Sequence, residues 1–119
     1  MSDKNVSKQS EIKIRVGLNK DNLPVELDWL SEEGENANTW NPVKALMVSL
    51  FDDETRDTLR IDLWTTEFQV IEMDRFMYQS LRSMADTYYR ATQNKELANE
   101  MQRFVQYFGE KTEVIPKNS

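Results

Sequence analysis

The sequence lacks cysteine and histidine altogether among its 119 residues. Without cysteine the chain can form no disulfide and hold no iron–sulfur cluster, and the lack of both residue types excludes most zinc and copper sites. The usual Ser-His and Cys-His pairs of nucleophilic catalysis are excluded in the same way. We therefore expect no catalytic residues of these kinds, no metal site and no bound cofactor.

Glycine, positive charge and long apolar segments are also scarce. The three glycines, Gly17, Gly34 and Gly109, lie too far apart to form a phosphate-binding loop. The net charge of −6 argues against nucleic acid or anionic lipid as a partner. The longest apolar run, residues 45–51, is far too short to span a membrane, and the first ten residues lack the apolar core of a signal peptide. We expect a cytoplasmic protein without membrane insertion.

The length of the chain suits one domain. Residues 1–10 are polar and are expected to form a disordered tail, residues 11–112 a single α+β domain, and residues 113–119 a C-terminal tail. Residues 31–41 form an acidic loop. Its spacing of oxygens fits a solvated connection better than a site for a metal or a basic partner.

Two hairpins are predicted by alternating apolar residues. The first joins residues 12–18 to residues 25–29 through a turn at 19–22. The turn predicts these opposite residues: Val16 with Val25, Ile14 with Leu27, Ile12 with Trp29, Arg15 with Glu26 and Lys13 with Asp28. In this register apolar residues face apolar ones and charges face opposite charges.

The second hairpin joins residues 43–51 to residues 58–64. The sequence Asn41-Pro42 could open a helix, but the alternation that follows favours a strand. A turn at residues 52–57 predicts these opposite residues: Leu50 with Leu59, Val48 with Ile61 and Leu46 with Leu63. The acidic pair in this turn, Asp52-Asp53, is typical of turns and is a weak catalytic candidate.

Two helices follow. Apolar residues recur with helical spacing from Val70 to Ala91, and Thr66 with Gln69 would form a capping box before them. A second apolar stripe, from Leu97 to Phe108, lies about 110° from the first, which predicts a break at 91–94. Two helices cover one face of a sheet of four strands. The predicted fold is therefore α+β: a four-stranded antiparallel sheet of two hairpins, followed by two helices packed on one face.

The sheet face left bare by the helices is the first candidate site. It would carry Met47, Phe51 and Trp64 together with Arg60 and Asp62, and exposed apolar residues among charges mark a partner site. The competing interpretations are that the indole of Trp64 folds over a sheet edge, or that the patch closes a homodimer.

The second candidate lies on the long helix. Tyr78, Arg82 and Tyr89 lie on one side of it, away from the apolar stripe, and tyrosine and arginine are common at interface centres. The alternative is that the helix is packed on two sides, with its tyrosines partly buried.

Three segments carry a family resemblance: Leu-Arg-Ile-Asp-Leu-Trp-Thr at 59–65, Ser-Met-Ala-Asp-Thr at 83–87 and Arg-Ala-Thr-Gln at 90–93. With the hairpin at 11–30 and Ser-Leu-Phe-Asp at 49–52, they make residues 11–112 resemble the gliding-motility protein GldC family. The resemblance implies a cytoplasmic accessory protein of surface gliding, working beside an envelope machine linked to protein secretion. It implies no catalytic residues. The polar N-terminal tail and the longer acidic loop depart from the family.

The function expected from these observations is that of a non-enzymatic adaptor. It would dock another protein of the motility or secretion apparatus through the uncovered sheet face. One alternative is a small acidic secretion chaperone that holds clients in a groove as an oligomer. Another is a small-molecule-binding domain with a pocket lined by Arg60, Asp62 or Tyr78.

Overall fold

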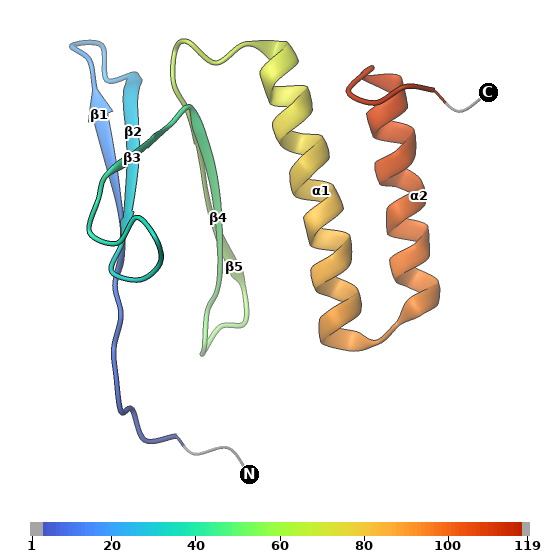
Figure 1. The fold of residues 1–119 in the computed structure, drawn as a ribbon, viewed down its shortest axis with the longest axis horizontal. Coiled ribbons are helices and arrows are strands. Elements are labelled where there is room, and N and C mark those ends of the chain that lie inside the picture. The colour runs from blue at the N-terminus through green and yellow to red at the C-terminus, as the bar shows by residue number, and fades with distance from the viewer. Residues whose placement is uncertain (1–3, 118–119) are drawn as a thin grey trace. The chain divides into compact units, whose positions relative to one another are not determined.

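The computed structural model describes residues 4–117, and the chain divides into two compact units (Figure 1). We call residues 1–68 the β unit and residues 69–119 the helical unit. The α+β class predicted from the sequence is confirmed, with antiparallel sheets followed by two helices. Residues 4–10 contain neither helix nor strand, and the outermost residues of the two predicted tails, 1–3 and 118–119, lie outside the described residues.

The β unit contains two sheets, which corrects the single four-stranded sheet expected from the sequence. Its strands, in chain order, are β1 Ile12–Leu18, β2 Pro24–Ser31, β3 Asn41–Val43, β4 Ala45–Phe51 and β5 Thr58–Trp64. The first three strands form one sheet in the order β1-β2-β3, and β4 pairs with β5 in the second (Figure 1).

The two sheets separate at Lys44. The segment expected to be one strand is interrupted there, so that β3 pairs with β2 while β4 pairs with β5. At this junction the backbone N–H of Thr65 donates to the carbonyl of Lys44 at 2.9 Å, and the N–H of Thr66 donates to that of Pro24 at 3.1 Å. These two hydrogen bonds tie one hairpin to the other.

The first hairpin has a different register from the one predicted. Arg15 lies opposite Asp28 and Val16 opposite Leu27, a shift of two residues. The cause is the turn, because the side-chain oxygen of Asn19 accepts from the N–H groups of Asp21 and Leu23 at 2.8 and 3.1 Å, and the ladder is irregular after Gly17. Since side chains alternate with a period of two, each side chain keeps the sheet face predicted for it.

The second hairpin follows its prediction. Residues 45–51 form a strand rather than a helix, and Leu50, Val48 and Leu46 lie opposite Leu59, Ile61 and Leu63. The Asp52 carboxylate closes the turn by accepting from the N–H groups of Thr55 and Glu54 at 2.8 and 3.0 Å. These hydrogen bonds lower the pKa of the Asp52 carboxyl, and the one from Thr55 has the largest effect.

The helical unit consists of α1 Val70–Thr92 and α2 Lys95–Lys111. The cap of α1 is Gln69, whose N–H donates to the Glu72 carboxylate at 3.1 Å, and not the expected Thr66. Thr66 is unavailable because its backbone belongs to the junction of the two sheets. The predicted break between the helices is confirmed at Gln93, which has a φ of 60°, and Asn94, whose side chain accepts from the N–H of Leu97.

Small residues fill the contact between α1 and α2. The buried residues of the two helices are Ala85, Ala98, Val105 and Gly109. A Cβ atom added to Gly109 would lie 2.6 Å from the Tyr78 ring, so the backbone of α2 lies directly against that side chain. The close approach of the two antiparallel helices depends on this absence of bulk.

Candidate functional site

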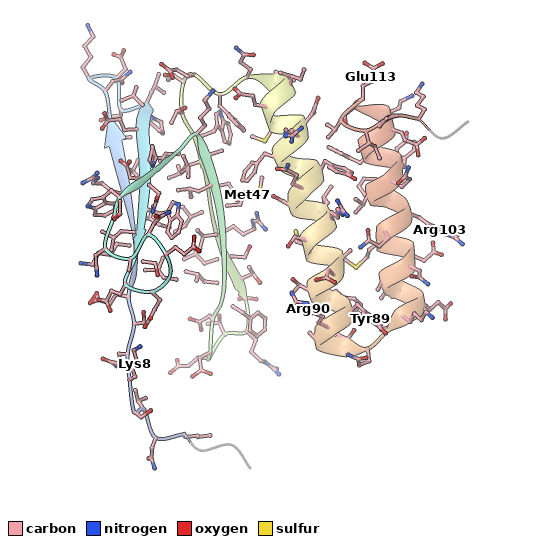
Figure 2. The ribbon with its side chains drawn as sticks, in the orientation of Figure 1. Lys8, Met47, Tyr89, Arg90, Arg103 and Glu113 are labelled. Atoms are coloured by element: carbon pink, nitrogen blue, oxygen red, sulfur yellow. The ribbon has the colours of Figure 1, made fainter. Side chains whose placement is uncertain are left out.

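Alternation along β4 and β5 places the predicted sheet residues on one face of their hairpin. Met47 lies opposite Asp62, and Trp64 lies opposite Ala45 (Figure 2 labels Met47 on β4). Phe51 lies opposite Thr58 at the far end, roughly 20 Å along the strand from Trp64. The structure therefore places Asp62 opposite Met47 and between Arg60 and Trp64, while Phe51 lies at the far end of this face, two residues beyond the position opposite Arg60.

Arg60 and Asp62 form a two-pronged ion pair on this face. The Arg60 Nε donates to Oδ2 of Asp62 at 3.2 Å, and Nη2 donates to Oδ1 at 2.8 Å. The hydrogen bond from Arg60 lowers the pKa of the Asp62 carboxyl and raises the pKa of the guanidinium. Both groups are exposed, so they present two charges on the sheet face that carries Trp64, and Asp62 also lines the hollow next to it.

Trp64 borders an apolar hollow of about 260 Å³. The residues that line it, which we call the Trp64 site, are Leu23, Pro24, Asp62, Leu63, Trp64, Thr65 and Thr66. The side chain of Trp64 is 53% exposed, and its cross-strand neighbour is the small Ala45. An aromatic ring therefore stands uncovered at the edge of a hollow that an apolar group can enter.

Leu23 and Pro24 are members of this site that the sequence reasoning missed. They follow the first turn, and the hydrogen bond from Thr66 to the carbonyl of Pro24 brings them to the end of β5. Leu23 is 49% exposed and lies outside both strands of its hairpin. An apolar residue at the end of a polar turn was the available signal.

A larger hollow, of about 570 Å³, lies beside the three-stranded sheet and has a charged lining that includes Arg15, Glu26, Asp28, Lys44 and Glu67. The Arg15 guanidinium already has two partners, because it contacts Asp28 at 3.4 Å and stacks over the Trp40 ring at 4.0 Å. The stacking ties the end of the acidic loop to β1. This hollow is a weaker candidate because its charges are of both signs and its arginine has partners.

The helical candidate residues lie differently from one another. Tyr78 packs against Gly109 of α2, and the neighbouring Ala85 is 1% exposed, so this side of α1 contacts α2. Arg82 is exposed, and Tyr89 is 38% exposed. The arrangement is that of a helix packed along the side on which the tyrosines lie.

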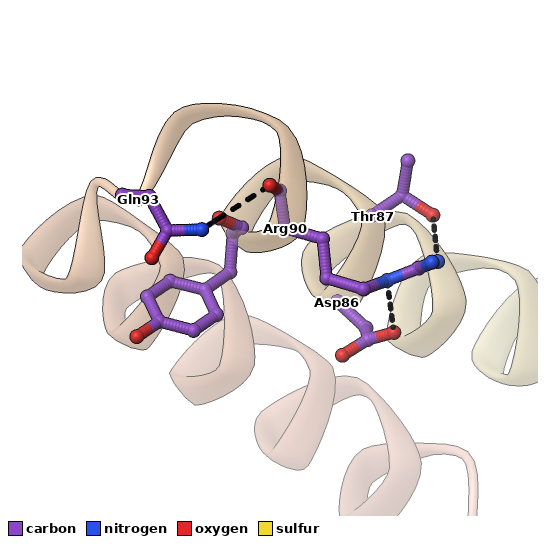
Figure 3. Close-up of polar contacts among 5 residues, drawn as sticks. Asp86, Thr87, Arg90 and Gln93 are labelled. Carbon is purple, nitrogen blue, oxygen red and sulfur yellow. Dashed lines mark hydrogen bonds and ion pairs between the residues drawn. The ribbon is translucent and has the colours of Figure 1, made fainter.

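The end of α1 carries a small polar network. Arg90 donates to Asp86 at 3.0 Å and to the Thr87 hydroxyl at 3.4 Å, and Gln93 donates to the Arg90 carbonyl at 3.2 Å (Figure 3). These residues lie in the two helical segments that carry the resemblance to GldC. Their contacts secure the last turn of α1 before the chain reverses.

Residues 4–117 contain neither a cluster of metal ligands nor a membrane-spanning helix. No three acidic side chains lie close enough together to hold a metal ion. Neither helix of this part of the chain has the length and apolar character needed to cross a bilayer.

The fold and the surface around Trp64 define an α+β protein with antiparallel sheets, a helical hairpin and an exposed aromatic site. A family model described as gliding motility-associated protein GldC-like matches residues 24–114. The chain belongs to this GldC-like family, as the resemblance in its sequence indicated, and is a gliding-motility-associated protein. The match contains both helices and all of the Trp64 site except Leu23. No curated protein matches the chain, and neither does any solved structure.

Proposed function

We propose that this protein is a non-enzymatic cytoplasmic adaptor of the gliding-motility apparatus and binds another protein at the Trp64 site. The observation that carries the proposal is a half-exposed tryptophan beside an apolar hollow. Large aromatic residues of this kind anchor protein interfaces, where truncation of one anchor commonly costs about 2 kcal/mol or more of binding free energy.

The size of the hollow supports a protein partner over a small molecule. Pockets for drug-sized ligands have volumes of roughly 300–1,000 Å³ and enclose most of the ligand. The hollow of about 260 Å³ lies below that range and suits one or two apolar side chains of a partner. Such a side chain would pack on the indole and against Leu23.

The Arg60–Asp62 pair supplies selectivity at the rim. Its two charges are held by hydrogen bonds of 2.8 and 3.2 Å and lie on the sheet face that carries Trp64. A partner with complementary charges is favoured, and one that places like charges there is rejected. The pair thus distinguishes a selected partner from the unfolded clients of a chaperone, which is the alternative that the sequence leaves open.

The test is capture of partners from a lysate of a gliding bacterium by the tagged full chain. Trp64→Ala should lower the affinity for the captured partner by at least about tenfold. The matched control is Trp29→Ala, which removes an indole of comparable exposure, 40%, from β2. Undiminished binding by Trp64→Ala, or equal loss in the two variants, would refute the site. Binding of many unrelated unfolded proteins would favour the chaperone.

A further inference from the structure

The outer edge of β4 has no neighbouring strand among residues 4–117, since β4 pairs with β5 alone. Hydrogen-bonded residue pairs alternate along an antiparallel ladder. The backbone bonds from Thr65 to Lys44 and from Asp52 to Asp57 mark both ends of this ladder as hydrogen-bonded pairs. The even-numbered residues of β4 therefore turn their backbone groups toward β5. The groups that point outward belong to Ala45, Met47, Ser49 and Phe51.

The chemistry of this edge is unlike that of the other edge strands described. Strand β1 carries Lys13 and Arg15, β5 carries the Arg60–Asp62 pair, and β3 contains Pro42. Charged residues and proline are the usual means of preventing strand pairing between molecules. The seven residues of β4, Ala-Leu-Met-Val-Ser-Leu-Phe, contain no charge, no proline and no glycine.

We propose that β4 pairs with β4 of a second copy of this chain, antiparallel and with a two-fold axis at Val48. This register sets Met47 of each copy opposite Ser49 of the other, Leu46 opposite Leu50, and Ala45 opposite Phe51. Every residue then lies opposite a residue on the same sheet face, and the phenyl ring of Phe51 lies opposite the small side chain of Ala45. The four outward-facing residues of each copy contribute about eight hydrogen bonds in total.

Three observations favour a second copy as the occupant of this edge. Leu46 and Leu50 lie at equal distances on either side of Val48, so they face each other in both halves of an isologous contact. A hairpin of two strands is marginal in water, and the pairing converts it into a sheet of four. The net charge of −6 opposes self-association, and β4 itself carries no charged residue that would be brought against its own copy.

The hydrogen bonds of the contact come from the outer backbone edge of β4, whereas Trp64 lies on β5, so truncation of its side chain removes none of them. Trp64→Ala should therefore leave the dimer intact. Failure of partner capture and failure of dimerisation can thus be told apart.

The decisive measurement is the mass of the full chain across a concentration series by analytical ultracentrifugation. The wild type should be a dimer. Ser49→Pro removes an outward N–H from each copy, and proline is tolerated at such an edge position within a monomer. The loss of two of about eight hydrogen bonds should raise the dimer dissociation constant by at least about tenfold. The control, Thr58→Pro, removes an outward N–H from the edge of β5 and should leave the constant unchanged.

Amide hydrogen exchange gives a second readout that does not depend on a mutation. In the dimer the outward amides of Met47, Ser49 and Phe51 should be protected, and dilution should release them, while those of Val48 and Leu50 stay protected. A wild-type chain that is monomeric at every concentration would overturn the proposal. So would a dimer that both proline variants weaken equally, or protection of the outward amides only after another protein is added.

Discussion

The two units of the molecule bury different kinds of residue. In the described part of the β unit the buried residues are Leu27, which is 1% exposed, and Thr65, which is 5% exposed. Both lie near the junction of the two sheets. In the helical unit the buried residues are small, with Ala85 and Gly109 at the contact of α1 with α2. The packing of the β unit therefore depends on the large side chain of Leu27. The packing of the helical unit depends on the small size of the side chains between α1 and α2.

The aromatic residues allow the two units to be observed separately. All three tryptophans, Trp29, Trp40 and Trp64, lie in the β unit, while all four tyrosines lie in the helical unit. Tryptophan fluorescence therefore follows the β unit during unfolding, and helical circular dichroism follows α1 and α2.

The largest effect is expected from Leu27→Ala. Removing a fully buried leucine leaves a cavity and should lower the free energy of unfolding by about 2–5 kcal/mol. Denaturant titration followed by tryptophan fluorescence measures this loss. The matched control is Leu59→Ala on β5, where the leucine is 60% exposed and the loss should stay below about 1 kcal/mol. Equal losses would show that the β unit has no single central residue.

A smaller loss is expected from Gly109→Ala. Alanine favours a helix over glycine by about 1 kcal/mol, but here its Cβ would lie 2.6 Å from Tyr78 and 2.8 Å from Ile115. We expect a net loss of about 1–3 kcal/mol, seen in the helical signal.

Two companion variants sharpen this test of the helical contact. Gln102→Ala changes an exposed position of α2 and should be nearly neutral. Tyr78→Leu removes the nearest ring atom and should reduce the loss caused by Gly109→Ala. A Gly109→Ala variant that is more stable than the wild type would contradict the close approach.

The smallest effect concerns pH and the turn of the second hairpin. The pKa of Asp52 is lowered in the folded state, so its carboxylate adds stability above its unfolded pKa of about 3.9. That stability disappears as the pH falls through the folded pKa. Asp52→Asn should therefore weaken the β unit at neutral pH, and its difference from the wild type should vanish in acid. Asp53→Asn is the control, and the same pH-dependent difference in that variant would contradict the role of Asp52.

The two hairpins show how far a sequence determines a register. In the second, the six residues between Phe51 and Thr58 fix the pairing, and the alternation of leucine and isoleucine agrees with it. In the first, the side chain of Asn19 closes a different turn, and two-residue slippage keeps every side chain on its face. Alternation predicts the face of a residue well, but the turn decides which residue lies opposite.

The separation into two sheets could not be predicted from the pattern of apolar residues. The alternation of apolar residues covers residues 46–51 and does not show where the strand begins, and the interruption at Lys44 arises from pairing with two different strands. The prediction that the helices cover one sheet face stays a prediction, as does that of a single domain over residues 11–112.

The candidate site was partly predictable. Alternation on β5 correctly places Arg60, Asp62 and Trp64 on one face, because that argument needs only a strand. Leu23 and Pro24 reach the site through the junction of the two sheets, which depends on contacts distant in sequence. For α1, the small size of Ala85 was the sign that its tyrosine-bearing side contacts another helix.

The alternation of side chains on β4 has a consequence for the proposed dimer. Residues opposite one another in an antiparallel pair lie on the same face, so both copies would display Met47 and Trp64 on one side of the joined sheet. A partner with two docking segments, or an array of partners, would then be held with avidity, because the second contact forms at high effective concentration. Two weak binding contacts on one sheet would then withstand a mechanical force that a single contact would not.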